Sequence, residues 1–204
     1  MDYTTSVEKD MTAISLLFEQ FDALDTSAVV CFRDKNGRLI DIYCGNPRLL
    51  MSCYASILNE NAFPNTSVME EDIKKNVEHF AEQEDAQKTE QLTAPSKTPE
   101  RSDYDPESIG VIKDILDRHT DPDEAWVLGF SIVDKSTGLL GTFFGKHGDP
   151  VYRAESVSAS ISRFIQNEEC PFCGGKWDYS HFLTHIKQVL EKTICVRKNK
   201  NNGL

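Results

Sequence analysis

The stretch CPFCGGKWDYSHFLTHI, at residues 170–186, combines the residue types that bind zinc in proteins. Two residues separate Cys170 from Cys173, and His185 follows His181 by four positions. Zinc is held by four such ligands in a tetrahedron. On a helix, side chains four positions apart leave the same face, so both imidazoles can reach one ion. The spacing therefore predicts a Zn2+ site formed by Cys170, Cys173, His181 and His185.

The neighbouring residues favour the local structure that such a site needs. Gly174 and Gly175 directly follow the second cysteine, where glycine allows backbone amides to approach the sulfur atoms. Asp178 is a favourable N-cap for a helix that contains both histidines. Phe182 and Ile186 lie near the histidine stripe, and we expect them to pack the cysteine turn onto this helix.

The predicted site is structural rather than catalytic. Four protein ligands leave no open position for water on the metal. Closed sites contribute folding free energy, roughly 10–16 kcal/mol in zinc-finger peptides, and not Lewis-acid chemistry. The sequence leaves open whether Cys195 replaces one histidine as a ligand.

Over residues 170–185 the chain resembles the zinc-finger family with two Cys and two His ligands. The resemblance implies that Cys170, Cys173, His181 and His185 bind zinc. Seven residues separate Cys173 from His181, whereas the family's usual spacing is about twelve. The second strand of the finger is therefore shorter, which argues against the family's usual docking into the major groove of DNA.

Hydrophobic periodicity before the metal motif predicts the order helix, two strands, helix, and predicts it twice. In the first half, apolar residues at three-and-four spacing predict a helix over residues 7–24. Two β-rich runs follow around Asn36-Gly37, the strongest short signal for a hairpin turn. Pro47 then suits the first turn of the next helix.

The second half repeats this order. Pro106 begins an amphipathic helical pattern, and two strand patterns follow about a turn at residues 134–138. A helix is predicted after Asp149-Pro150. The motif CGNP before one helix corresponds to HGDP before the other.

We therefore expect an α+β fold in which two αββα units form one antiparallel sheet covered by helices, with a small C-terminal zinc module. Between the units, proline-rich and polar sequence predicts a linker without a core. Four domains are predicted. They are a first unit with an extra helix near 68–82 (residues 1–81), a flexible acidic linker (residues 82–104), a second unit (residues 105–167), and the zinc module with a basic tail (residues 168–204). In architecture alone, helix–hairpin–helix order also resembles sensor or scaffold modules of the roadblock or profilin-like kind.

Charge is unevenly distributed along the chain. The net charge of −11 argues against a general polyanion binder. Residues 161–204 hold seven Lys/Arg against four Asp/Glu, a net of +3, whereas the first 160 residues hold 15 against 29, a net of −14. An acidic body with a mildly basic C-terminal end follows from these counts.

The sequence predicts a cytoplasmic protein with no membrane partner. No apolar run approaches the roughly 18 residues of a membrane span, and the N-terminus MDYTTSVEKD is acidic and polar. In the cytoplasm, six cysteines indicate metal ligands or core residues rather than disulfides. Cys31, Cys44 and Cys53 lie in apolar patterns and are predicted to be buried.

Enzyme motifs are not found. The segment GTFFGKHG has three residues between Gly141 and Gly145, where a phosphate-binding loop has four, and it lacks the Ser or Thr that follows the lysine of such a loop. A calcium loop through Gly37 would place Phe32 where an acidic ligand is required. His119, at a predicted helix end, suits capping rather than a catalytic triad. We therefore expect a protein that is not an enzyme.

The sequence thus predicts an intracellular zinc-binding regulator or inhibitor that acts through protein–protein interaction. The alternative is a nucleic-acid-binding protein, whose zinc module contacts phosphates and offers aromatic rings for stacking. The acidic charge, the single finger and its spacing favour the protein partner. The residues of the alternative site, in residues 170–204, are Lys176, Trp177, Tyr179, Lys187, Lys192, Arg197, Lys198 and Lys200.

Overall fold

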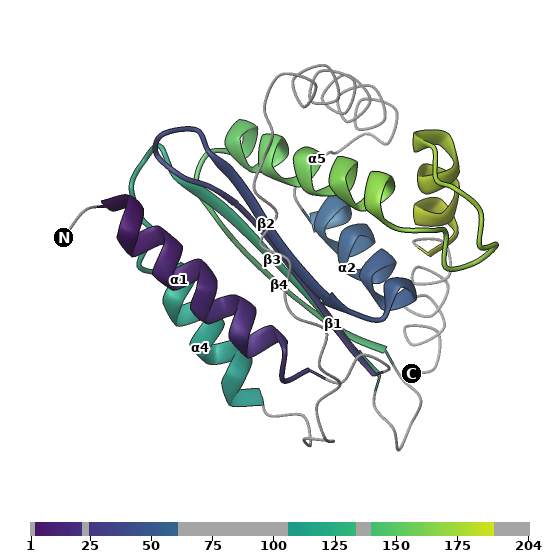
Figure 1. Ribbon diagram of the computed structural model, residues 1–204, viewed down its shortest axis with the longest axis horizontal. Coiled ribbons are helices and arrows are strands. Elements are labelled where there is room, and N and C mark those ends of the chain that lie inside the picture. Colours follow the sequence, from purple (N-terminus) through teal and green to yellow (C-terminus); the bar gives the residue numbers. More distant parts are fainter. Residues whose placement is uncertain (1–2, 22–24, 61–105, 134–139, 190–204) are drawn as a thin grey trace, which may run out of the picture.

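A four-stranded antiparallel sheet forms the centre of the computed structural model, which describes residues 3–21, 25–60, 106–133 and 140–189. The strand order is β2-β1-β3-β4, so β1 and β3 are central and both edges are open (Figure 1). The predicted combination of helices with an antiparallel sheet is confirmed. The strand bounds are β1 (Thr26–Arg33), β2 (Leu39–Gly45), β3 (Ala125–Val133) and β4 (Leu140–His147).

Helices cover both faces of this sheet (Figure 1). Pro47, Pro106 and Pro150 each begin a helix, as predicted, because proline has a suitable φ and lacks the amide that a first turn leaves unpaired. The helices are α1 (Tyr3–Phe18), α2 (Pro47–Glu60), α4 (Pro106–Leu116) and α5 (Pro150–Asn167), and residues 179–189 are also helical.

The first helix differs from its predicted extent of residues 7–24. It begins at Tyr3 and ends at Phe18. The amides of Gln20 and Phe21 donate to carbonyl groups only three residues earlier, at 3.1 Å each. Such short-range bonds tighten and end a helix, although the apolar periodicity continues to Phe21.

Alternating residues of the two central strands face opposite sides and divide the core in two. One cluster lies under α1 and α4, and we call this side the α1/α4 face; the other lies under α2 and α5, the α2/α5 face. The α1/α4 face receives Ala28, Val30, Phe32, Trp126, Leu128 and Phe130 from the strands. The α2/α5 face receives Val29, Cys31 and Val127.

Glycines fix three of the turns. Gly37 has a φ of 80°, in the predicted hairpin turn. Gly45 and Gly148 have φ values of 93° and 86°, where other residues are strained. A Cβ at Gly45 would lie 2.1 Å from the carbonyl oxygen of Thr26, and one at Gly148 would lie 2.3 Å from that of Glu124. The turns at Gly45 and Gly148 therefore require glycine, and each lies two positions before a helix of the α2/α5 face.

Several predicted features lie outside the described residues. They are the helix near 68–82, the linker at 82–104 and the turn at 134–138. The division of the chain into four domains therefore stays a prediction. Within the described parts of the chain, no helix is both long enough and apolar enough to cross a membrane.

Candidate metal centre

A tight turn brings the two cysteines of the motif together. The amide of Cys170 donates to the carbonyl of Gly175 at 2.9 Å, and the amide of Gly174 donates back to the carbonyl of Cys170 at 2.8 Å. Gly174 has a φ of 69°, which glycine adopts without strain. Glu169 and Lys176 pair as an antiparallel bridge at the base of the turn. The predicted glycine-assisted turn is present.

A capped helix carries the two histidines. The carboxylate of Asp178 accepts the amide of His181 at 2.7 Å, which is the predicted N-cap interaction. The helix at residues 179–189 places His181 and His185 on one face, with their Nε2 atoms 3.0 Å apart. Both imidazoles therefore converge on one point beside the cysteine turn.

The donor atoms lie at separations that suit a tetrahedral metal ion. Cys170 Sγ is 3.6 Å from the Nε2 atoms of both His181 and His185, and Cys173 Sγ is 3.6 Å from His181 Nε2. Zinc–ligand bonds of about 2.3 Å to sulfur and about 2.0 Å to nitrogen require S···N separations of about 3.6 Å in a tetrahedron. The donor atoms of Cys170, His181 and His185 all lie within 4.8 Å of one another. The structure thus contains a compact Cys/His cluster that can hold a metal ion.

Aromatic rings hold the imidazoles in place. The ring of Phe172 stacks on His185, with centroids 4.4 Å apart and planes 21° apart. The ring of Trp177 lies 5.1 Å from His181 and 5.9 Å from His185. Arg48 packs its guanidinium 5.7 Å from the Phe172 ring, and its Nε donates to the carbonyl of Pro171 at 3.0 Å.

Sequence reasoning missed both Phe172 and Arg48. Phe172 lies between the two cysteines, so its position was a usable signal for contact with the site. Arg48 lies on α2, more than a hundred positions earlier, and no local pattern connects it to the motif. Only the tertiary fold brings this side chain to the cysteine turn.

The described cysteines Cys31, Cys44, Cys53, Cys170 and Cys173 differ in their environments. Cys31 and Cys53 are fully buried in the α2/α5 face, and burial raises the pKa of each thiol to about 12. Cys53 donates to Ser131 Oγ at 3.2 Å, so it behaves as a neutral core residue, as predicted. Cys44 is partly buried. Cys170 is 1% exposed but faces the histidines, and Cys173 is exposed at the surface of the turn.

The proposed nucleic-acid residues are only partly placed. Lys176 and Lys187 lie on the surface. Trp177 was expected to offer its ring for stacking, but it is 8% exposed, with its ring 6.0 Å from Phe164 and 5.8 Å from Phe182. Tyr179 is partly buried against the same cluster. The remaining candidates lie outside the described residues, as does Cys195: Lys192, Arg197, Lys198 and Lys200.

The histidine helix packs more widely than expected. Phe182 and Ile186 were expected to pack the cysteine turn onto this helix. They belong to one buried cluster with Cys170 of the turn, and that cluster also includes residues of α2 and α5. The metal motif follows α5 directly in the chain, so the helix that carries the histidines lies close to the body and its apolar side packs there.

A second group of titratable residues lies on the α1/α4 face. His119 is buried, with Nδ1 3.3 Å from Glu124 Oε1 and Nε2 3.3 Å from Asp10 Oδ2. Its ring also contacts Phe32 edge-on, at 4.9 Å between centroids. The imidazole therefore connects α1 to the loop before β3, rather than serving only as a helix cap. The two carboxylates lie on opposite sides of the ring, so this group does not converge on a metal position.

No protein-family model, curated protein or solved structure matches this chain. A functional argument therefore has to come from the geometry of the Cys/His cluster and from the surface around it.

Proposed function

We propose that this chain is a non-enzymatic zinc-binding protein in which Cys170, Cys173, His181 and His185 hold one Zn2+. The observation that carries the proposal is the set of three S···N separations of 3.6 Å, which match tetrahedral zinc. Thiolate and imidazole donors favour zinc over magnesium or calcium, which take oxygen ligands.

The role of the ion in this proposal is structural. Four protein donors complete the shell of zinc and leave no position for a reacting water. The rings of Phe172 and Trp177 flank the imidazoles and restrict their rotation. Ligand side chains that are restricted in this way are typical of a structural metal site.

Metal analysis of the purified chain tests this proposal. We expect one zinc per chain, and we expect Cys173→Ser and His185→Gln to lose it. His147→Gln is the matched control, because His147 lies on β4 and stacks on Trp126 at 6.2 Å, away from the cluster. Zinc retained at full stoichiometry by both ligand variants, or lost equally by the control, would overturn the assignment.

We further propose that the body consists of two αββα units that share one sheet, with the zinc module following the second. The described elements run α1, β1, β2, α2 in the first half and α4, β3, β4, α5 in the second. Gly45 and Gly148 support the correspondence, because each has positive φ and each lies against the residues at the start of the neighbouring central strand. The zinc module is proposed to extend from residue 168.

The molecular role that we propose is binding to a protein partner, as a regulator or inhibitor. Two exposed apolar side chains on the edge strand β4, Leu140 (44% exposed) and Phe143 (53% exposed), support it, as does the acidic net charge of −11. The burial of Trp177 removes one expected stacking platform for a nucleic acid.

Binding of the zinc-loaded chain to labelled DNA and RNA separates the two classes. We expect no binding at low salt. Binding that weakens steeply with added salt, and that disappears when residues 170–204 are deleted, would replace the protein partner with a nucleic acid.

A further inference from the structure

We propose that the bound metal keeps residues 170–189, which we call the cap segment, packed against the apolar surface of α2 and α5. Loss of the metal releases the cap segment and uncovers that surface, while the sheet and its helices stay folded. This inference rests on the proposed zinc site, and it adds a consequence of metal loss to it.

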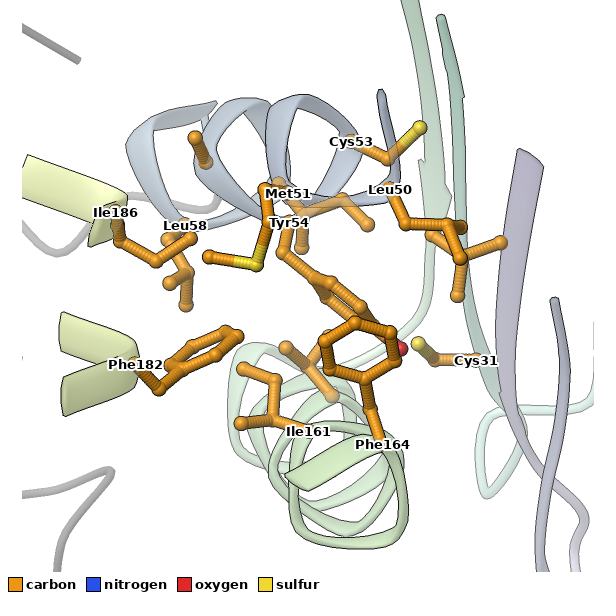
Figure 2. Packing of buried hydrophobic residues seen from close by; sticks show 14 of the residues in the cluster. Cys31, Leu50, Met51, Cys53, Tyr54, Leu58, Ile161, Phe164, Phe182 and Ile186 are labelled. Atoms are coloured by element: carbon orange, nitrogen blue, oxygen red, sulfur yellow. The ribbon is translucent and has the colours of Figure 1, made fainter. Parts of the chain in front are cut away.

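The cap segment buries apolar side chains in the body of the protein. Figure 2 shows Phe182 and Ile186 pointing from the helix of the cap segment toward Leu58, Tyr54 and Phe164. Phe182 is fully buried, with its ring 6.1 Å from Tyr54 and 6.3 Å from Phe164. The cap segment therefore covers the space between α2 and α5.

The metal connects the two ends of this segment. Cys170 and Cys173 belong to the turn that follows α5, and His181 and His185 belong to the helix. A single ion bound to all four closes the segment into a loop and fixes the helix beside the turn. The helix at residues 179–189 is short, and isolated helices below about 12–15 residues are marginal in water.

The contacts of Arg48 with the cysteine turn offer little substitute for the metal. Arg48 Nε donates to the Pro171 carbonyl, at the surface of the turn. The interaction of Arg48 with the Phe172 ring is equally exposed, and exposed contacts of this kind contribute little. The Arg48 contacts alone therefore do not hold the cap segment, and in this proposal apolar packing and the metal do.

The body retains a core when the cap segment leaves. Among the buried residues of the α2/α5 cluster, the cap segment contributes Cys170, Trp177, Phe182 and Ile186, and its Tyr179 and Val189 pack against the cluster. The other members of that cluster come from β1, β3, α2 and α5, and the cluster of the α1/α4 face contains no cap residue. Release is therefore expected to be local.

The chain carries one tryptophan on each side of this boundary. Trp177 belongs to the cap segment and lies 5.1 Å from His181, whereas Trp126 is buried in the α1/α4 face. These are the two tryptophans of the sequence. The emission of Trp177 thus reports on the cap segment, and the emission of Trp126 reports on the body.

The test uses two single-tryptophan variants of the full zinc-loaded chain, Trp126→Phe and Trp177→Phe. Zinc is removed with EDTA, and its release is measured in the same samples. In the Trp126→Phe variant we expect the emission to shift to longer wavelength and anilinonaphthalene sulfonate to bind, with both changes reversed by added zinc. In the Trp177→Phe variant we expect the emission of Trp126 to stay unchanged.

Each other outcome overturns the proposal. If zinc is released and the emission of Trp177 and the dye signal stay constant, the cap segment does not depend on the metal, and the zinc site alone stands. If the emission of Trp126 shifts as well, the whole chain unfolds and release is not local. If the chain binds no zinc at all, the proposed function itself fails.

A variant that leaves every ligand in place gives a second test. Ile186→Ala removes part of the apolar contact of the cap segment. We expect zinc affinity to fall by about tenfold or more, because truncation of a buried isoleucine costs more than the energy equivalent of that factor. Unchanged zinc affinity in a folded Ile186→Ala variant would show that packing and metal binding are not coupled.

Discussion

The α1/α4 face and the α2/α5 face of the sheet are covered by different kinds of structure. On the α1/α4 face, two helices close the core, and His119 connects them to the sheet through carboxylates on either side of its ring. On the α2/α5 face, two helices leave part of the core to residues 170–189. This short segment completes that face with Trp177, Phe182 and Ile186, and in our account a metal ion holds it there.

The difference shows how a small module can depend on a larger one. A separate zinc finger folds around its metal alone. Here the apolar residues of the module lie in the core of the body, so metal affinity and the packing of α2 and α5 influence each other. Changes on the α2/α5 face should therefore alter zinc binding, and equal changes on the α1/α4 face should not.

The largest expected effect comes from a large-to-small change in each core. Phe164 is fully buried on the α2/α5 face, where its ring lies 5.4 Å from Tyr54 and 6.0 Å from Trp177. We expect Phe164→Ala to cost about 3–5 kcal/mol of unfolding free energy and also to weaken zinc binding. Urea unfolding and zinc titration measure the two quantities.

Phe130→Ala is the matched control on the α1/α4 face, since Phe130 is also fully buried. We expect a similar loss of unfolding free energy, about 3–5 kcal/mol, with zinc affinity unchanged in the folded protein. Equal weakening of zinc binding by both variants would contradict the difference between the faces.

A smaller effect is expected at the glycine turns that precede α2 and α5. Gly45→Ala and Gly148→Ala each place a Cβ against a backbone oxygen at positive φ. We expect each to cost at least about 1–3 kcal/mol. Thermal unfolding of the two variants measures the loss of stability. Gly110→Ala in α4 is the control, because nothing lies within 4 Å of its added Cβ, and a similar loss there would contradict the argument.

A loss of about 1 kcal/mol is expected from Tyr54→Phe. The hydroxyl of Tyr54 and Ser160 Oγ form a buried hydrogen bond of 2.8 Å between α2 and α5. The variant removes that bond but keeps the ring that contacts Phe182. Denaturant unfolding measures the change. A loss above that of Phe164→Ala would show that polar contacts, and not apolar packing, dominate this face.

The last expected effect is confined to alkaline pH. Burial raises the pKa of Cys31 and Cys53 from 9.0 to about 12, so the folded state disfavours their thiolates. Their contribution to stability is complete below pH 9 and is lost as the pH rises toward 12, because the unfolded thiols ionise first. Unfolding free energy should therefore fall between about pH 9 and about pH 12. Cys31→Ala should reduce this fall, and an identical pH dependence would contradict the assignment.

Features with a local signal could be predicted from the sequence. Asn36-Gly37 marked a hairpin, and Pro47, Pro106 and Pro150 each marked the start of a helix, because turn geometry depends on adjacent residues. The Cys/His motif was predictable for the same reason. Its two halves lie close together in sequence, and Asp178 signals the start of the helix that carries both histidines.

Features that depend on tertiary packing could not be predicted in this way. The pairing of β1 with β3 joins residues from different halves of the chain, and periodicity contains no information on strand order. The burial of Trp177 likewise depends on Phe164 and Phe182, which only the folded chain brings to its ring. Tryptophan in a basic segment was therefore taken for a surface residue, although it completes a core.

X-ray absorption spectroscopy of the zinc-loaded chain tests the central claim most directly, because it measures the ligands of the ion themselves. Our account predicts four-coordinate zinc with two sulfur ligands at about 2.3 Å and two nitrogen ligands at about 2.0 Å. His185→Gln should remove one nitrogen ligand or the metal. A shell made mainly of oxygen ligands, or one that His185→Gln leaves unchanged, would contradict the account.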